Sequence, residues 1–439
     1  MTYTLAKHPL ANRDKNRLGV DDTAAHEWYR FVLSYPPHLV RDYLNRFGVR
    51  PGQQVLDPFC GTGTTLVECK KLGFRAVGIE GNPMAHFAST VKCDWSIDPT
   101  ALILNAQEVC DAAHWRLNDD GIPDAPCLNG FIPTHSVERS LPEEALSLLL
   151  TNSISSRPLH KALVLLEALE SHSHPRYKQH MKLAFAKAVV FSASNLRFGP
   201  EVGLGKIKSD AAVVEPWFEL VQLMANDLIH LYPRETHPST VHLGDARNSN
   251  DYIPPTSIAA VITSPPYPNE KDYTRTTRLE SVLLGMVSTK EELRNLKRTL
   301  VRSNTRSVYS MDKDDEWVSE HPEVSRIAHE IERRRIELGK TSGFERLYAR
   351  LTKLYFGGMM RHLASLRTSL LPGARLAYVV GDQASYLRVL IRTAHILGDL
   401  ATKLGYEVEG IDLFRTRAAT ATKSELREEV LILKWVGGW

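Results

Sequence analysis

Short apolar runs alternate with amphipathic segments along this chain, which is the pattern of an α/β protein. Residues 55–56 are apolar, a glycine-rich turn follows, residues 65–72 are amphipathic, and residues 76–79 are apolar again. That order predicts a strand, a turn, a helix and a second strand. Five further apolar runs predict strands downstream, at residues 240–243, 258–262, 374–380, 407–414 and 429–434. We therefore expect a sheet of seven strands.

Two long segments with helical periodicity interrupt this alternation. The first lies between about residues 100 and 235 and predicts helices at residues 142–150, 159–169, 177–192 and 215–231. The second lies between about residues 279 and 370 and predicts helices at residues 291–300, 323–338 and 343–370. Both segments are read as helical insertions into one α/β domain.

Composition limits the class of protein without identifying a substrate. The 439 residues are 43% hydrophobic and 24% charged, with a net charge of +3, which leaves room for a polyanionic partner but does not argue for one. No signal-peptide core or long apolar run occurs, so we expect a cytoplasmic protein. The five cysteines are odd in number and widely spaced, which argues against a disulfide framework and a zinc site.

A glycine-rich turn joins the first predicted strand to the first predicted helix. Gly61 and Gly63 give the backbone room to approach a ligand, and the helix N-terminus behind them offers unpaired amide donors. The third glycine of the dinucleotide fingerprint is replaced by Leu66, which argues against a nicotinamide or flavin cofactor. A tight turn without a ligand is the alternative.

Two acidic residues follow later strands in positions that suit a nucleoside. Glu80 ends the second strand about 20 residues beyond the turn, where a carboxylate can accept hydrogen bonds from both ribose hydroxyls. Asp245 follows the third strand, where its carboxylate can accept a hydrogen bond from an adenine amino group. An ordinary helix cap is the alternative for Asp245.

The turn and its flanks resemble the S-adenosylmethionine loop of the DNA amino-methyltransferases of the N4-cytosine and N6-adenine type. The matching run is Asp57-Pro58-Phe59-Cys60-Gly61-Thr62-Gly63-Thr64-Thr65. The resemblance implies that this loop surrounds the methionine part of the cofactor, with Glu80 at the ribose and Asp245 at the adenine. Asn82 and Ala246 are further predicted cofactor-binding residues. An upstream segment with Tyr35 and Pro36 resembles the element that closes over the methionine part, and core packing is its alternative.

The tetrapeptide Ser264-Pro265-Pro266-Tyr267 directly follows a predicted buried strand. Its prolines remove two amide donors, so the backbone there presents only acceptors. An exocyclic amine of a nucleobase is a poor nucleophile, and acceptors for its hydrogens favour the reactive pyramidal form. We assign these acceptors to the Ser264 hydroxyl and the Pro265 carbonyl, and base stacking to Tyr267. A purely structural Pro-Pro turn is the alternative.

The tetrapeptide resembles the Ser-Pro-Pro-Tyr variant that usually accompanies cytosine N4 methylation, whereas the adenine N6 enzymes more often begin this motif with Asp or Asn. The family resemblance implies a Rossmann-like class I methyltransferase fold, with a mostly parallel seven-stranded sheet and helices on both faces. Together with the helical periodicity, it divides the chain into a closing segment and cofactor-binding half at 1–99, an inserted helical subdomain with a candidate target-recognition role at 100–236, and a catalytic half at 237–439 with a basic helical insertion at about 279–370.

Four basic residues are the predicted contacts to DNA phosphates: Arg275, Arg278, Lys297 and Arg298. A solvated helix start is the alternative for the first two. The run 333–335 lies among glutamates and predicts a salt-bridged solvent face. His172 and His174 lack further ligands at metal spacing, so no metal site is expected. Cys60 lacks the separate Pro-Cys loop that cytosine C5 methylation requires.

These observations favour a site-specific DNA methyltransferase that transfers a methyl group from S-adenosylmethionine to the N4 amine of a cytosine flipped out of double-stranded DNA. Three alternatives stay open. They are an N6-adenine DNA methyltransferase, a methyltransferase of a tRNA or rRNA base amine, and a catalytically silent subunit that recognises DNA. A restriction or other defence protein is the candidate protein partner.

Overall fold

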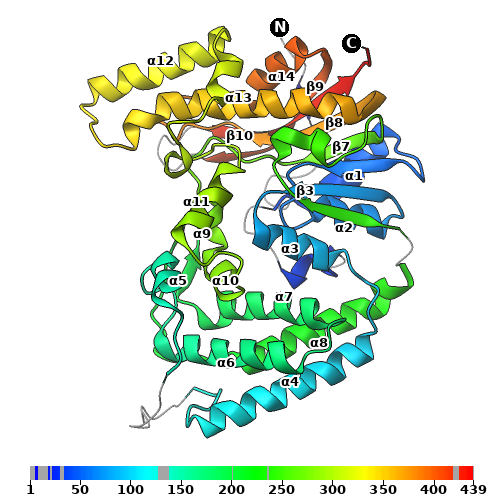
Figure 1. Cartoon of the computed structure of the whole chain (residues 1–439). Helices are drawn as coiled ribbons and strands as arrows, with labels where there is room; N and C mark the ends of the chain where they lie inside the picture. Colours follow the sequence, from blue (N-terminus) through cyan, green and yellow to red (C-terminus); the bar gives the residue numbers. More distant parts are fainter. Residues whose placement is uncertain are drawn as a thin grey trace.

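The computed structural model shows a large sheet covered by helices on both faces, with a separate layer of helices beside it (Figure 1). It describes residues 5–7, 18–19, 22–29, 34–126, 138–199, 201–234, 237–418 and 425–438. Cys127 lies outside these residues, and the four described cysteines are buried and form no disulfide with one another. Within the described residues no helix is long and apolar enough to cross a membrane, and no cluster of three metal-ligand side chains occurs.

The sheet has the strand order β1-β9-β10-β8-β7-β2-β3-β6. Its strands are β1 (Leu5–Lys7), β2 (Gln54–Asp57), β3 (Arg75–Glu80), β6 (Ser239–Leu243), β7 (Ile258–Thr263), β8 (Leu370–Gly381), β9 (Tyr406–Ala418) and β10 (Glu425–Trp435). Only β10 runs antiparallel to its neighbours. The seven predicted strands and the Rossmann-like arrangement are confirmed, and the short β1 adds an eighth strand at the edge next to β9.

The two faces of the sheet belong to two separate hydrophobic clusters. Val55 of β2 packs into the cluster of α1 (Pro37–Phe47), α2 (Thr64–Lys71) and α3 (Pro83–Lys92). The next residue, Leu56, packs into the cluster of α13 (Tyr348–Leu366) and α14 (Thr393–Lys403). Successive strand side chains point to opposite faces, so an uninterrupted apolar run is what a sheet buried on both faces requires.

A helical part lies between β3 and β6 in the sequence and beside the sheet in space (Figure 1). Its helices are α4 (Pro99–Asp119), α5 (Glu143–Leu148), α6 (Ser156–His172), α7 (Lys178–Ala188) and α8 (Val214–Leu231), and a hairpin of β4 (Leu196–Phe198) and β5 (Val202–Leu204) projects from it. Leu165 and Trp217 join the same cluster as Val55. The helical part and the sheet therefore share one continuous core.

The sequence prediction missed two elements of the helical part. The 21-residue α4 was not recognised, although Asp98 caps it and Pro99 occupies its first turn. Its buried positions Leu102, Ala106 and Val109 follow helical spacing, so a count of that periodicity would have found it. The β4–β5 hairpin was also missed, because three-residue strands leave too short an alternation to detect.

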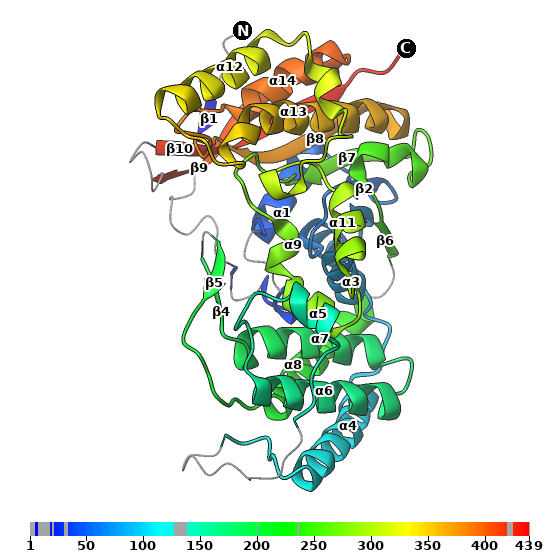
Figure 2. The same ribbon diagram turned by 60° about the vertical axis from the view of Figure 1, so that its left-hand side comes forward.

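The connection between β7 and β8 is the second insertion. It contains α9 (Tyr273–Thr276), α10 (Arg278–Leu283), α11 (Lys290–Arg298), α12 (Pro322–Glu337) and α13. Two views show α9 to α11 between the helical part and the sheet, while α12 and α13 lie on the side of the sheet opposite the helical part (Figures 1 and 2). The predicted helix at 343–370 was too long at both ends, because α13 spans Tyr348–Leu366 and β8 begins at Leu370.

Candidate active site

A cavity of about 250 Å³ lies where the carboxyl ends of β2, β3, β6 and β7 meet the second insertion. The predicted residues in its wall are Tyr35, Pro58, Phe59, Cys60, Gly61, Thr62, Thr64, Glu80, Asn82, Asp245, Ala246, Ser264, Pro265, Pro266, Tyr267 and Lys297. Seven predicted residues are not in the wall: Pro36, Asp57, Gly63, Thr65, Arg275, Arg278 and Arg298. The two sequence motifs thus meet in one cavity, although 206 residues separate Asp57 from Thr263.

The glycine-rich turn depends on two positions where only glycine fits. Gly63, the residue before α2, has φ of 85°, and a Cβ there would lie 2.9 Å from Cβ of Ser89. Gly78 of β3 lies beneath the turn, where a Cβ would be 2.8 Å from Sγ of Cys60. Burial raises the pKa of the Cys60 thiol well above its usual value, so this cysteine stays protonated. It therefore acts as a packing residue and not as a nucleophile.

Asp57 lies behind the cavity wall and ties three segments together. Its Oδ1 accepts hydrogen bonds from the Phe59 amide at 3.2 Å and the Thr263 hydroxyl at 2.6 Å, and its Oδ2 accepts one from the Tyr35 hydroxyl at 2.8 Å. Complete burial raises the pKa of Asp57 to about 6. Thr65 adds a second tie, because its hydroxyl donates to the carbonyl of Ile262 at 3.0 Å. Both side chains fix the position of the loop against β7.

The Glu80 carboxylate is held by the backbone and faces the cavity. Its Oε2 accepts a hydrogen bond from the Gly61 amide at 2.8 Å, and its Oε1 accepts one from the Asn82 amide at 2.8 Å. Burial raises the pKa of Glu80 to about 7. A carboxylate oxygen has two acceptor positions, so one bond to each oxygen leaves capacity for two ligand hydroxyls. Asn82 caps α3, and its amide nitrogen donates to the Thr277 hydroxyl at 3.0 Å.

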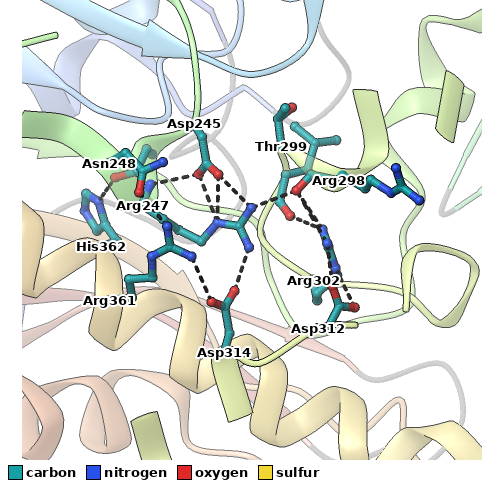
Figure 3. Close-up of polar contacts among 12 residues, drawn as sticks. Asp245, Arg247, Asn248, Arg298, Thr299, Arg302, Asp312, Asp314, Arg361 and His362 are labelled. Atoms are coloured by element: carbon teal, nitrogen blue, oxygen red, sulfur yellow. Dashed lines mark hydrogen bonds and ion pairs between the residues drawn. The ribbon is translucent and has the colours of Figure 1, made fainter. Parts of the chain in front are cut away.

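The Asp245 carboxylate lies in the wall and also forms a bidentate ion pair (Figure 3). It caps the short helix η6 (Ala246–Asp251) by accepting a hydrogen bond from the Arg247 amide at 2.9 Å. Its two oxygens also accept hydrogen bonds from Nε of Arg247, both at 3.0 Å, and Oδ2 accepts one from Nη2 at 2.7 Å. Asp245 therefore caps a helix, which was the alternative interpretation from the sequence, and it also lines the cavity.

The tetrapeptide presents acceptors to the same cavity. The Ser264 hydroxyl donates a hydrogen bond of 3.1 Å to the carbonyl of Val379 in the neighbouring strand β8, and its side chain also lies within hydrogen-bond reach of the Tyr267 hydroxyl. Burial raises the pKa of the Tyr267 hydroxyl, which keeps that side chain neutral. The Tyr267 ring lies against Gly381, where a Cβ would approach Cε2 of the ring to 3.1 Å. Gly381 thus leaves the space that the ring occupies.

The four basic residues predicted to contact DNA differ in exposure. Lys297 is 9% exposed and pairs with Asp272 at 2.7 Å. Arg278 donates to the Thr274 hydroxyl at 2.8 Å and to the carbonyl of Leu148 at 3.3 Å. Arg275 is half-buried, whereas Arg298 is exposed and lies over the Tyr309 ring. Two of the four predicted DNA contacts, Lys297 and Arg278, are therefore engaged in contacts within the protein.

Several residues in the wall were not found from the sequence, among them Lys271, Asn304, Arg415, Arg417 and Glu428. Asn304 is 5% exposed, and its amide nitrogen donates to the carbonyl of Lys271 at 3.1 Å. Glu428 on β10 forms ion pairs with Arg415 and Arg417 on β9. These residues come from three distant segments with no common motif, so only the folded chain brings them together.

Comparisons with known proteins agree with this geometry. A family model described as DNA methylase, of the N6 and N4 type, matches residues 8–89, which include the glycine-rich turn and Glu80. The chain is 25% identical over 434 residues to the Type II methyltransferase M.BsoBI of Geobacillus stearothermophilus, covering 91% of this chain and 82% of that protein. It is also 25% identical over 412 residues to the Type II methyltransferase M.AvaI of Nostoc sp., covering 88% of this chain and 80% of that protein.

A solved structure, TrmN from Thermus thermophilus, aligns with 91% of this chain and 48% of its own chain, at 10% identity and a TM-score of 0.27. That score is too low to support an argument about the site. The two Type II relatives are more informative, because their alignments span both halves of the sheet and both insertions.

Proposed function

The chain belongs to the family of DNA amino-methyltransferases, and we propose that it methylates the N4 amine of a cytosine flipped out of double-stranded DNA, with S-adenosylmethionine as the methyl donor. The observation that carries the proposal is the meeting of two acceptor sets in one cavity. Glu80 and Asp245 are one set, Ser264 and Pro265 are the other, and all four line the cavity.

The residues of the cavity suit S-adenosylmethionine. Glu80 lines the cavity and is proposed to accept hydrogen bonds from the ribose hydroxyls, while the Gly61 and Asn82 amides hold its carboxylate in place. Asp245 supplies an acceptor for the adenine amine, and the turn at Gly61 and Gly63 brings backbone close to the methionine part. When bound, the cofactor supplies an electrophilic methyl group on a sulfonium.

The tetrapeptide prepares the amine of the target base. Its lone pair is delocalised into the ring, and acceptors for its two hydrogens favour the pyramidal form in which the lone pair can attack. The Ser264 oxygen and the Pro265 carbonyl are these acceptors. Donation of the Ser264 proton to Val379 orients the hydroxyl for this role. The Tyr267 ring stacks on the extruded base and offsets part of the cost of unstacking it.

The choice of cytosine over adenine rests on Ser264. The resemblance of the tetrapeptide to the Ser-Pro-Pro-Tyr variant favours cytosine, because the adenine enzymes more often have Asp or Asn at this position. The helical part, residues 100–236, is proposed to recognise the target sequence. Arg275 and Arg298 are proposed to contact DNA phosphates. Arg275 is half-buried and Arg298 is exposed, whereas Lys297 pairs with Asp272 and Arg278 donates to Thr274 inside the protein. We place the enzyme in the cytoplasm, beside a restriction or defence protein that acts on the same DNA.

The deciding experiment identifies the methylated nucleoside. DNA and RNA are incubated separately with the protein and labelled S-adenosylmethionine, digested to nucleosides and separated by chromatography. We expect labelled N4-methylcytosine from DNA. Labelled N6-methyladenine would show that the target base is adenine, and label in RNA alone would show that the substrate is RNA. No label in either would indicate a subunit without catalytic activity. Ser264→Ala protein is the matched control for background label.

A further inference from the structure

A buried arginine links the Asp245 carboxylate to the second insertion (Figure 3). Arg247 is 6% exposed and lies between two carboxylates. It forms the bidentate pair with Asp245, and its Nη1 donates to Oδ2 of Asp314 at 2.6 Å. Its Nη2 also donates to the carbonyl of Arg298 at the end of α11, at 2.8 Å. The guanidinium thus connects Asp245, which follows β6, to Asp314 and the Arg298 carbonyl in the second insertion.

The Asp314 side of this contact is itself fixed by close packing. Asp314 begins the short helix η8 (Asp314–Val318), and its other oxygen accepts a hydrogen bond from Arg361 of α13 at 3.3 Å. The Asp314 backbone lies against Gly357 of α13, where a Cβ would be 1.7 Å from the Asp314 carbonyl oxygen. No side chain fits there, so the glycine sets how closely η8 approaches α13 and where the Asp314 carboxylate stands.

The insertion also reaches the cavity directly. Thr299, Leu300 and Val301 follow α11 and line the cavity. Leu300 lies on Gly81, the residue after Glu80, where a Cβ would be 2.6 Å from Cδ2 of Leu300. From the other side, Nδ1 of the α13 residue His362 is 2.7 Å from the Ala246 carbonyl, and its Nε2 is 2.8 Å from the Tyr378 hydroxyl. Burial lowers the pKa of His362 to about 4, so the ring is neutral and donates only through Nδ1.

We propose that Arg247 is a positioning residue for the cofactor: with Asp314 it aims the Asp245 carboxylate at the adenine amine and ties that orientation to the second insertion. Without Arg247, the Asp245 carboxylate can rotate about its side-chain bonds. The bidentate contact with the planar guanidinium fixes its orientation. The Asp245 carboxylate, which lines the cavity, is then held in one orientation. The inference rests on the proposed cofactor but not on the choice of target base.

The test compares two ligands that differ along one edge of the purine. S-adenosylhomocysteine carries an amine at C6, whereas S-inosylhomocysteine carries a carbonyl oxygen there and a proton on N1, so only the first donates to an aspartate from C6. Their dissociation constants are measured by calorimetry on the whole chain without DNA. For the wild type we expect the adenosine compound to bind at least about tenfold more tightly, because the bond to a charged acceptor is lost with the inosine compound.

The informative variant is Arg247→Gln/Asp314→Asn, which removes one positive and one negative charge from the cluster. We expect the preference for the adenosine compound to fall to within about twofold, with little change for the inosine compound. Arg247→Lys keeps the charge but not the planar fork and is expected to lose most of the preference. A purely structural role would weaken both ligands equally. A retained preference in either folded variant overturns the proposal, as does a wild type without one.

A second buried ion pair in the same insertion provides the matched control. Arg302 donates to Asp312 at 2.7 Å and is 3% exposed, but neither residue contacts Asp245. Arg302→Gln/Asp312→Asn is expected to lower the melting temperature and to keep the ligand preference. Loss of preference in this control would assign the effect to loosening of the insertion. Because the assay involves no methyl transfer, its outcome is independent of the nucleoside identified in the labelling experiment.

Discussion

The Thr263 hydroxyl donates a hydrogen bond of 2.6 Å to the buried carboxylate of Asp57. Thr263 ends β7 and directly precedes the tetrapeptide, whereas Asp57 ends β2 and begins the glycine-rich turn. This bond therefore helps to fix the distance between the cofactor loop and the proposed acceptors of the amine. The relationship leads to the first of five predictions.

Thr263→Val removes the donor but keeps the shape of the side chain. The buried Asp57 oxygen then loses its shortest hydrogen bond, and we expect the free energy of unfolding to fall by about 1–3 kcal/mol and methyl transfer to slow. Thr263→Ser keeps the hydroxyl and should stay close to the wild type in both measurements. Denaturant unfolding and turnover are measured for each protein, and wild-type values for the valine variant would contradict the role of this bond.

The affinity for S-adenosylhomocysteine should depend on pH through Glu80. Burial raises the pKa of Glu80 to about 7, and the carboxylate is the better acceptor for ribose hydroxyls, so binding favours the ionised form. Affinity should therefore rise about tenfold between pH 6 and pH 8 and level off above that range. Glu80→Gln should bind weakly and show a flat profile. An unchanged pH profile in the glutamine variant would show that another group titrates.

Ser264→Ala and Tyr267→Ala separate chemistry from cofactor binding. The first removes an acceptor for the amine and the second removes the stacking ring, so we expect methyl transfer to be abolished in both. Affinity for S-adenosylhomocysteine should stay within about threefold of the wild type, because neither side chain is assigned to the cofactor. Transfer is measured with labelled cofactor and binding by calorimetry. Full activity in both variants would refute the mechanism.

Lys297 and Arg298 are neighbours in sequence but should respond differently to alanine substitution. Lys297→Ala leaves the buried Asp272 without its cation, and we expect a loss of about 3–5 kcal/mol of stability. Arg298→Ala should leave stability unchanged, weaken DNA binding and reduce the slope of log affinity against log salt by about one. Thermal melts and salt titrations with a DNA duplex check both. Equal effects of the two variants would contradict the assignment.

Gly357→Ala tests the packing of η8 on α13. A methyl group would meet the Asp314 carbonyl oxygen at 1.7 Å, so we expect more than about 3 kcal/mol of destabilisation, although alanine is ordinarily the better helix former. Gly358→Ala is the control, because its nearest contact, at 3.2 Å, is a carboxylate oxygen at the end of a side chain. Denaturant unfolding should rank the first variant far below the second.

The central strands were predictable because they are apolar on both faces. Val55 and Leu56 pack into different clusters, so the run has no polar gap and stands out from its surroundings. The long helix α4 was missed although its spacing is regular, because small residues such as Ala106 and Ala113 mark much of its buried face. Alanine in a sequence is a weak indication of burial, because it also occurs often on exposed surfaces. These alanines are buried because α4 packs against other helices.

The site was predictable at the level of motifs and not at the level of contacts. Motif spacing could place Glu80, Asp245 and Ser264 at strand ends, because carboxyl ends of parallel strands share one edge. It could not reveal that Asp57 lies behind the cavity wall or that Lys297 is buried against Asp272. Both facts depend on partners that lie in other segments of the chain.

The pairing of β2 with β7 has a consequence for how this protein can vary. These two strands are neighbours in the sheet, yet the helical part lies between them in the sequence. The entropy of closing a loop grows only with the logarithm of its length, so closing about 200 residues costs only about 2 kcal/mol more than closing about 30. Lengthening the loops of the helical part therefore adds little to the entropic cost of forming the sheet, and selection can extend them while Asp57 and Thr263 stay paired.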